Sequence, residues 1–256
     1  SDIVFNSSFP EPEINKDKVD VIDEINSYED TPSELIYDEF EKQLFHNHSL
    51  GRLILGTPEN VESFTSDKIK TFINNNYFTN QMVISIVSST KADKWFRLCE
   101  KYFGFQTQKI DNRKRNKAQV QYGIEKKYNR DTYQSHAVIG TASYGYKSEK
   151  KAAFSLLNNM LGGWAMNSYL NMHIREKYGF TYTIESNYTA YSDVGVFAIY
   201  AGTDKKYMDK TIKLINKELD YFTQNLLPEK TLQKFKQQMK GQLAISCRSE
   251  EHTSEL

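Results

Sequence analysis

The sequence predicts an α+β fold in which two related layers of helices pack on mostly antiparallel sheets. Three observations support this class: apolar residues recur at helical spacing in several segments, short β-rich runs lie between them, and one pair of these runs is joined by a hairpin-like turn. The 256 residues are 39% apolar, 13% aromatic and 26% charged, as in a soluble globular protein. This length favours two domains.

The first predicted domain, residues 1–110, is mainly helical. We expect helices over 10–30, 33–45 and 65–75, because acidic residues or Thr65 stand at their starts. The apolar, β-branched run 82–87 predicts a buried strand, and residues 91–103 predict an amphipathic helix. The core candidates of that helix are Trp95, Phe96, Leu98, Tyr102 and Phe103.

A basic, polar stretch over 111–127 is typical of a solvated linker, so we place the domain boundary there. The second predicted domain, 128–247, mixes strands and helices. Gly179 is expected to close one of these helices as a C-terminal cap. The expected strands are 136–141, 182–190 and 196–201, and the expected helices are 148–161, 166–177, 204–225 and 228–246.

Both ends of the sequence are unusual. The chain opens on Ser1 in what we interpret as the middle of a domain, so we expect a fragment cut at both ends. Residues 248–256 resemble the in-frame translation of a sequencing adapter, and we interpret them as a scar outside the fold.

Charge and composition exclude several classes of protein. The 33 basic residues balance the 33 acidic ones, which argues against nucleic acid as a partner despite the basic run over 113–117. No apolar run is long enough for a membrane span of roughly 18 residues, so no membrane partner is expected. The two cysteines, Cys99 and Cys247, lack metal-type spacing and indicate a reducing compartment. We expect a cytoplasmic location.

The first long helix carries two carboxylates close to its apolar stripe, which is formed by Ile14, Val21, Ile25 and Tyr28. At about 100° per residue, Glu24 lies roughly 60° and Asp17 roughly 40° from Val21, on the same side. Both are therefore expected to project with the apolar face, where a charge is costly unless it is paired or bound to a metal. From periodicity alone, the simpler explanation is a half-buried helix with Glu24 at the rim of the stripe or paired to a basic residue.

Residues 2–57 resemble the latter part of the catalytic domain of pitrilysin/insulinase-type zinc peptidases. The motifs that carry the likeness are Phe9-Pro10-Glu11, Val21-Ile22-Asp23-Glu24-Ile25, Tyr28-Glu29-Asp30-Thr31-Pro32, His48-Ser49-Leu50-Gly51-Arg52 and Ile54-Leu55-Gly56-Thr57. The resemblance implies that Glu24 is the third ligand of one Zn²⁺ ion and that Asp17 is an acidic residue that steers the ligands. The family's His-x-x-Glu-His motif is missing and is expected upstream. His46 and His48 are expected to form part of a loop.

A second block resembles the family's other, non-metal domain. It comprises Leu161-Gly162-Gly163, Met166-Asn167-Ser168, Leu170, Arg175-Glu176-Lys177, Gly179 and Tyr182. The resemblance implies that Arg175 and Tyr182 are catalytic residues that bind the substrate backbone and the oxyanion. Without it, the preferred explanations are a helix-terminal cation for Arg175 and an amphipathic strand residue for Tyr182.

The resemblance implies half of a clamshell-type metallopeptidase. The intact protein is expected to be a zinc metalloendopeptidase that forms a homodimer and hydrolyses peptides or unfolded segments inside a closed chamber. The fragment alone is expected to be inactive. The alternative is a non-catalytic structural or regulatory subunit that partners an active chain.

Overall fold

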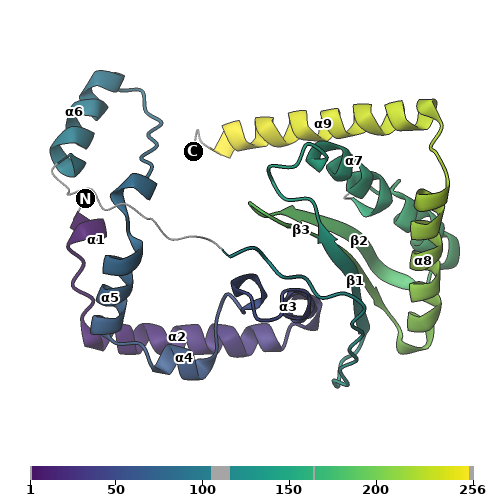
Figure 1. Cartoon of the computed structure of the whole chain (residues 1–256), viewed down its shortest axis with the longest axis horizontal. Coiled ribbons are helices and arrows are strands. Elements are labelled where there is room, and N and C mark those ends of the chain that lie inside the picture. Colours follow the sequence, from purple (N-terminus) through teal and green to yellow (C-terminus); the bar gives the residue numbers. More distant parts are fainter. Residues whose placement is uncertain (1, 105–115, 164, 254–256) are drawn as a thin grey trace. The chain divides into compact units, whose positions relative to one another are not determined.

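A computed structural model of the chain describes residues 2–104, 116–163 and 165–253. The chain divides into two compact units (Figure 1). Unit 1 comprises Ser1–Glu29 and Leu53–Asn116, and unit 2 comprises Asp30–Arg52 and Lys117–Leu256. Residues 30–52 therefore belong to unit 2, although they precede most of unit 1 in the sequence. The predicted domain boundary at 111–127 stays a prediction, and its first five residues lie outside the described ones.

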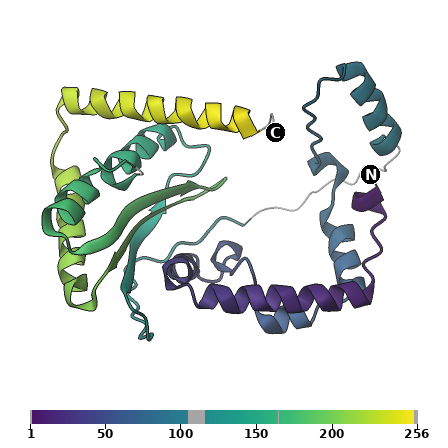
Figure 2. The ribbon, with the colours of Figure 1, turned by 180° about the vertical axis from the view of Figure 1, so that it is seen from behind.

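Unit 1 is built from helices. Local sequence explains where they begin: Glu11 and Glu13 stand in the first turn of α2, and the Thr65 hydroxyl accepts the Lys68 amide proton at the start of α5. Helix α4 lies along α2 (Figure 2), and Ser66 at the start of α5 donates its amide proton to Glu11 Oε1 at 2.8 Å. The helices are α1 (Asp2–Phe5), α2 (Glu11–Glu29), α4 (Pro58–Glu62), α5 (Ser66–Asn76) and α6 (Ala92–Phe103), with the short η2 (Thr79–Gln81).

Two predictions about the part of unit 1 that follows α5 are wrong. Residues 82–87 form no strand, and Val83 and Val87 are 91% and 89% exposed. A strand needs a neighbour to accept its backbone hydrogen bonds, and the described residues of unit 1 contain no other strand. In α6, Phe96 and Tyr102 are exposed, while Trp95, Leu98 and Phe103 are half-buried. The helix itself is confirmed, but it packs less of its apolar face than its pattern predicts.

Unit 2 is organised around a three-stranded antiparallel sheet with the order β1-β3-β2. The central β3 pairs with both neighbours, and all nine of its residues are buried. The predicted hairpin between β2 and β3 is confirmed. The elements are α3 (Pro32–Leu44), η1 (Ser49–Gly51), β1 (Ser135–Ser143), α7 (Lys151–Gly162), the π-helix η3 (Asn171–Glu176), β2 (Thr181–Ala190), β3 (Gly195–Thr203), η4 (Lys205–Tyr207), α8 (Met208–Gln224) and α9 (Glu229–Thr253).

One face of the sheet packs on the helices that follow β1. Helix α7 contacts β2, α8 contacts β3, and α9 runs beside α7 (Figure 1, Figure 2). Alternate residues of the strands point into this layer, as a pleated sheet requires. The core consists of Leu161, Leu170, Ile174, Ile184, Phe197, Ile199, Ala201 and Ile215.

The opposite face of the sheet is covered by α3, and both aromatic and polar contacts hold the helix there. The Tyr37 ring stacks on the Tyr200 ring with centroids 5.7 Å apart, and the Tyr37 hydroxyl donates to Glu185 Oε1 at 3.2 Å. Burial raises the pKa of Tyr37, and Glu185 adds to this effect. At the end of α3, Leu44 and Phe45 pack against Val196 of β3.

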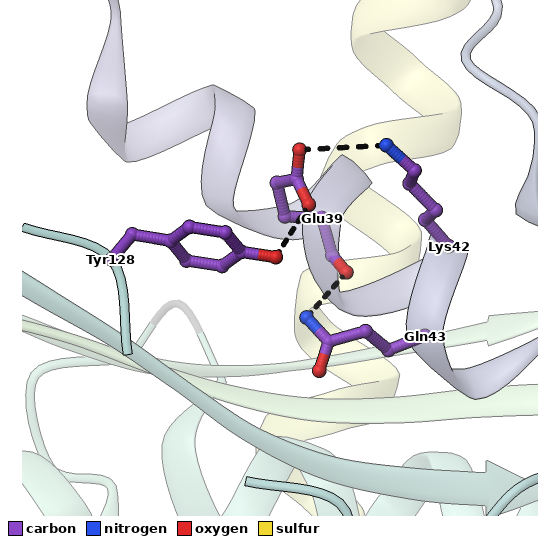
Figure 3. A network of polar contacts seen from close by, with 4 residues as sticks. All are labelled: Glu39, Lys42, Gln43 and Tyr128. Carbon is purple, nitrogen blue, oxygen red and sulfur yellow. Dashed lines mark hydrogen bonds and ion pairs between the residues drawn. The ribbon is translucent and has the colours of Figure 1, made fainter. Parts of the chain in front are cut away.

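A polar network joins α3 to the segment that precedes β1 (Figure 3). The Tyr128 hydroxyl donates to Glu39 Oε2 at 2.8 Å, and Lys42 Nζ lies 3.9 Å from the other carboxylate oxygen. Gln43 Nε2 donates to the Glu39 backbone carbonyl at 2.9 Å. Helix α3 is thus tied to the rest of unit 2 by contacts from Tyr37 to its C-terminal end.

These elements confirm the predicted α+β class. Most predicted helices and all three predicted strands of the second part exist within a few residues of their expected bounds. Among the described residues, no helix combines the length and apolar character that crossing a bilayer requires.

Candidate functional site

Arg175 lies on a π-helical turn. Residues 169–178 are helical as predicted, but η3 interrupts the α-helical hydrogen bonding over Asn171–Glu176. Leu170 and Ile174 are fully buried and anchor this turn in the core, and His173 Nδ1 lies 2.9 Å from Glu218 Oε2 of α8. A π-turn rotates the side chains that follow it and is frequent at functional sites. Arg175 is half-buried, with Nη1 3.9 Å from the sulfur of Met166.

Gly179 closes this helix, as the sequence predicts. Its φ of +63° lies in the left-handed region, where a residue with a side chain would be strained. Its amide donates to the Arg175 carbonyl at 2.9 Å, as in a helix C-terminal cap. The chain then enters β2 at Thr181. The turn therefore separates Arg175 from Tyr182 by only a few residues of fixed backbone.

Tyr182 is the extra residue of a β-bulge. Thr181 pairs with Thr203 and Thr183 pairs with Gly202, so Tyr182 has no opposite residue in the β2–β3 ladder. A bulge re-aims the side chain it carries and is common beside active sites. Tyr182 is 51% exposed, and its hydroxyl donates to Asp204 Oδ1 at 2.9 Å. This hydrogen bond to a carboxylate is the main reason that the pKa of Tyr182 is raised.

Asp204 is a site residue that the sequence did not reveal. It follows the last residue of β3 and is half-buried, and its second oxygen, Oδ2, lies 3.8 Å from Lys206 Nζ. The only available signal was an aspartate at the start of a predicted helix, which is typical of a cap and does not indicate a tyrosine partner. The contact depends on the β2–β3 register, which the sequence does not specify.

Glu24 and Asp17 lie on α2 of unit 1, and both are exposed. The prediction that they project with the buried face is therefore wrong. Burial on α2 is centred on Ile14 and Ile25, and Glu24 and Asp17 are displaced from that line by about 90° and 70°. The two carboxylates nevertheless share one side of the helix, two turns apart. Whether Glu24 binds zinc stays a prediction.

The described residues do not by themselves form a zinc site. No group of three or more His, Cys, Asp or Glu residues in this part of the chain is arranged to hold a metal. A catalytic zinc needs three protein ligands, so Glu24 could supply only one of them. His48 has the expected role in a turn, since its Nδ1 accepts the Leu50 amide proton at 3.2 Å.

Comparisons with known proteins show which family the chain resembles and which candidate residues the match contains. Residues 63–239 match the family model for the peptidase M16 inactive domain, a range that contains Arg175 and Tyr182 but not Glu24. The chain is 32% identical over 97% of its length to a Bacillus subtilis protein named "Uncharacterized zinc protease YmxG", and 29% identical over its full length to a Rickettsia felis "Uncharacterized zinc protease". It spans about three fifths of these relatives, 60% and 61%.

The fold also matches solved structures. The crystal structure of a peptidase M16 inactive domain from Pseudomonas fluorescens aligns with a TM-score of 0.83 at 21% identity, over 93% of this chain and 58% of that one. A protease from Helicobacter pylori aligns with a TM-score of 0.78 at 19% identity, over 92% of this chain and 58% of that one. At these identities the likeness concerns the fold.

Proposed function

We propose, from the premise that this chain belongs to the peptidase M16 family, that the whole protein is a zinc-dependent metalloendopeptidase and that Arg175 and Tyr182 bind its substrate. The relatives named as zinc proteases support membership of a protease family. The observation that carries the proposal lies in unit 2. Both predicted residues stand on backbone irregularities, a π-turn and a β-bulge, on either side of the left-handed turn at Gly179.

The chemistry of these two side chains suits a peptide. The Arg175 guanidinium offers several fixed N–H donors, which can bind the carbonyl oxygens of a peptide backbone and the charge that develops on them. A regular helix and a regular strand would point the two side chains in other directions. The π-turn and the bulge would therefore serve to direct Arg175 and Tyr182 toward the peptide. Arg175 would orient the peptide, and Tyr182 would hold it at the start of β2.

Glu24 is the zinc ligand that this chain would supply, with Asp17 as the neighbouring carboxylate that steers it. The remaining ligands would come from residues beyond this chain, and the bound Zn²⁺ would activate water. The proposed substrates are peptides or unfolded protein segments held in a closed chamber, and the proposed assembly is a homodimer. We propose a cytoplasmic location.

A non-catalytic role for the whole protein is the second candidate, and one observation favours it. The family model that matches this chain is described as the inactive domain, and its range excludes Glu24. A protein that kept the substrate-binding residues but lacked a complete metal site would bind peptides and partner an active chain.

Metal content and hydrolysis of the whole protein separate the two candidates. The unmutated protein should contain about one zinc per chain by elemental analysis and should hydrolyse an unstructured peptide. Glu24→Gln should lose both, whereas Glu13→Gln should keep both, because Glu13 is an exposed carboxylate on the same side of α2. Arg175→Ala should keep the zinc and lower kcat/KM about a hundredfold. If the unmutated protein neither holds zinc nor cleaves peptides, the non-catalytic role stands.

A further inference from the structure

We propose that a patch of lysines and aromatic rings selects peptides that carry acidic side chains, glutamate or aspartate, at one fixed position. The inference rests on the proposed function, since it takes a peptide as the substrate, and it names the class of peptide that is preferred. The patch joins the turn before β2 to η4 and the start of α8. This lysine–aromatic patch comprises Lys177, Tyr178, Phe180, Lys206, Tyr207 and Lys210.

Three stacked aromatic rings form the base of the patch. Phe180 is the middle ring, and its centroid lies 5.5 Å from that of Tyr178 and 4.6 Å from that of Tyr207. Phe180 and Tyr207 are half-buried, and the hydroxyl of fully buried Thr203 donates to the Phe180 carbonyl. Rings that are already packed lose little conformational freedom when a ligand binds. The base of the patch is therefore preorganised.

Each of the three rings has a lysine ammonium over its face. Contacts of this kind reach to about 6 Å from the ring centroid, and they restrain a side chain that is otherwise flexible. All three lysines are exposed, so their charges stay accessible to a ligand. The distances from Nζ to the ring centroid are 5.4 Å for Lys177 over Tyr178, 4.8 Å for Lys206 over Tyr207 and 5.8 Å for Lys210 over Phe180.

Two of these lysines have no carboxylate partner within the part of the chain that the structure describes. Neither Lys177 nor Lys210 forms an ion pair there with an aspartate or glutamate. Lys206 does, because its Nζ lies 3.8 Å from Asp204 Oδ2. Asp204 also accepts the Tyr182 hydroxyl proton, so its charge is shared between two partners. The patch therefore presents at least two ammonium groups that a carboxylate from outside the chain can pair with.

The position of the patch indicates which anion it binds. Tyr182, Asp204 and Lys206 form a continuous series of contacts, at 2.9 and 3.8 Å, so the patch borders the residue proposed to hold the peptide. A peptide held there brings its neighbouring side chains close to the lysines, and carboxylates are the anions that such side chains supply. Nucleic acid fits less well, because exposed Glu176 and Asp209 lie in the same segments and the chain as a whole is neutral.

Peptide binding measures the preference without any hydrolysis. Fluorescence anisotropy with dye-labelled, unstructured peptides compares a pair of glutamates with a pair of glutamines, moved stepwise along one sequence. At one position the glutamate pair should bind about tenfold more tightly, as two exposed ion pairs allow. Salt at about 500 mM should remove most of this preference by screening. No preference at any position, or an equal gain at every position, would overturn the proposal.

A double variant tests whether these lysines cause the preference. Lys177→Gln combined with Lys210→Gln should abolish it and leave the affinity for the glutamine peptide unchanged. The matched control, Lys234→Gln combined with Lys240→Gln, removes the same charge from exposed positions of α9 and should keep the preference. Lys177→Glu combined with Lys210→Glu should reverse it in favour of a peptide with a lysine pair. A misfolded protein gains no new preference, so the reversal separates a direct contact from a loss of structure.

Hydrolysis by the whole protein separates failure of this inference from failure of the proposed function. The glutamate peptide should have a kcat/KM about tenfold above that of the glutamine peptide, mainly through KM. If both peptides are cleaved equally well, the patch selects nothing and the proposed function stands. If neither is cleaved, the proposed function is wrong, and the binding preference still decides the role of the patch. Tighter binding of a short single-stranded oligonucleotide, lost in the double variant, would overturn the assignment to a peptide.

Discussion

Two apolar runs of similar composition have different structures in the two units. Residues 82–87 in unit 1 and 196–201 in unit 2 are both rich in β-branched and apolar residues, and the sequence predicts a buried strand for each. The second run lies in β3, between two partner strands, and is buried. The first has no partner strand among the described residues of unit 1, and Val83 and Val87 are almost fully exposed.

The difference shows that apolar pattern and tertiary pairing contribute separately. Unit 2 buries both faces of its sheet, one under α7 and α8 and the other under α3. Among the described residues of unit 1, the buried apolar ones are Ile14, Ile25 and Val61. We therefore expect the free energy of local opening to be low in unit 1 and high in unit 2.

Limited proteolysis should show the largest contrast. Thermolysin cleaves before valine and isoleucine, which occur in both runs. Cleavage within 82–88 should be at least about a thousandfold faster than within β3, because β3 must first open by several kcal/mol. Mass spectrometry of the early fragments measures this ratio. Equal rates would mean that the two runs are equally protected.

Truncating a buried side chain should have the second-largest effect, and it should differ between the two units. Ile199 is fully buried at the centre of β3, so Ile199→Ala should lower the free energy of unfolding of unit 2 by about 3 kcal/mol. Val83→Ala, the matched change in unit 1, should alter stability by less than about 0.5 kcal/mol. Urea unfolding combined with hydrogen exchange of the strand amides reports both values. A large effect of Val83→Ala would place that residue in a core.

Crowding at the α3–sheet contact should have a somewhat smaller effect. A Cβ added at Gly140 of β1 would overlap the Phe197 carbonyl oxygen of β3 and would also lie 2.7 Å from Phe40 Cζ of α3. Gly140→Ala should therefore cost about 2 kcal/mol of unfolding free energy. Phe40→Leu should recover only a small part of this loss when the two changes are combined, because the overlap with the Phe197 carbonyl remains. Gly241→Ala on α9, where an added Cβ meets no atom, is the control in the same thermal unfolding assay.

Alkaline pH should give the smallest effect. Burial raises the pKa of Tyr191 to about 12, and Glu41, which accepts its hydroxyl proton, adds to this. The folded state then binds the proton more tightly than the unfolded state. The contribution of Tyr191 to the free energy of unfolding is therefore complete below pH 10 and is lost as the pH rises from 10 to 12.

The Tyr191 phenol is half-exposed, so solvent screening reduces this contribution to about 1 kcal/mol. Tyr191→Phe should flatten the fall of unfolding free energy between pH 10 and 12. Tyr122→Phe should not, because Tyr122 is 71% exposed. Identical pH profiles for the two variants would remove Tyr191 as a source of alkaline sensitivity.

The sequence predicted what depends on local pattern. The helices α2, α3, α5 and α6, the β2–β3 hairpin and the cap at Gly179 follow from capping residues and periodicity, and the structure contains all of them. The π-turn under Arg175 and the bulge at Tyr182 were missed, because each depends on which backbone groups pair in three dimensions. The Asp204 contact was missed for the same reason.

For the carboxylates of α2, periodicity predicted which residues share a side of the helix but not which side is covered. Asp17 and Glu24 do lie on one side, yet burial follows Ile14 and Ile25. The residues that line up on one side of a helix follow from the sequence of that helix alone. Whether that side is buried depends on which other elements pack against it. The prediction of Glu24 and Asp17 as site residues therefore depends on the family resemblance and gains no support from helical periodicity.

The membership of α3 in unit 2 has a consequence for synthesis on the ribosome. Helix α3 ends at Leu44, but β1 begins only at Ser135 and β3 at Gly195. At roughly 5–20 residues per second, α3 emerges about 8 to 32 seconds before the strands it covers are complete. During that interval the apolar residues Phe40, Leu44 and Phe45 have no sheet to pack on. The nascent chain should be a client for holding chaperones until β3 has been made.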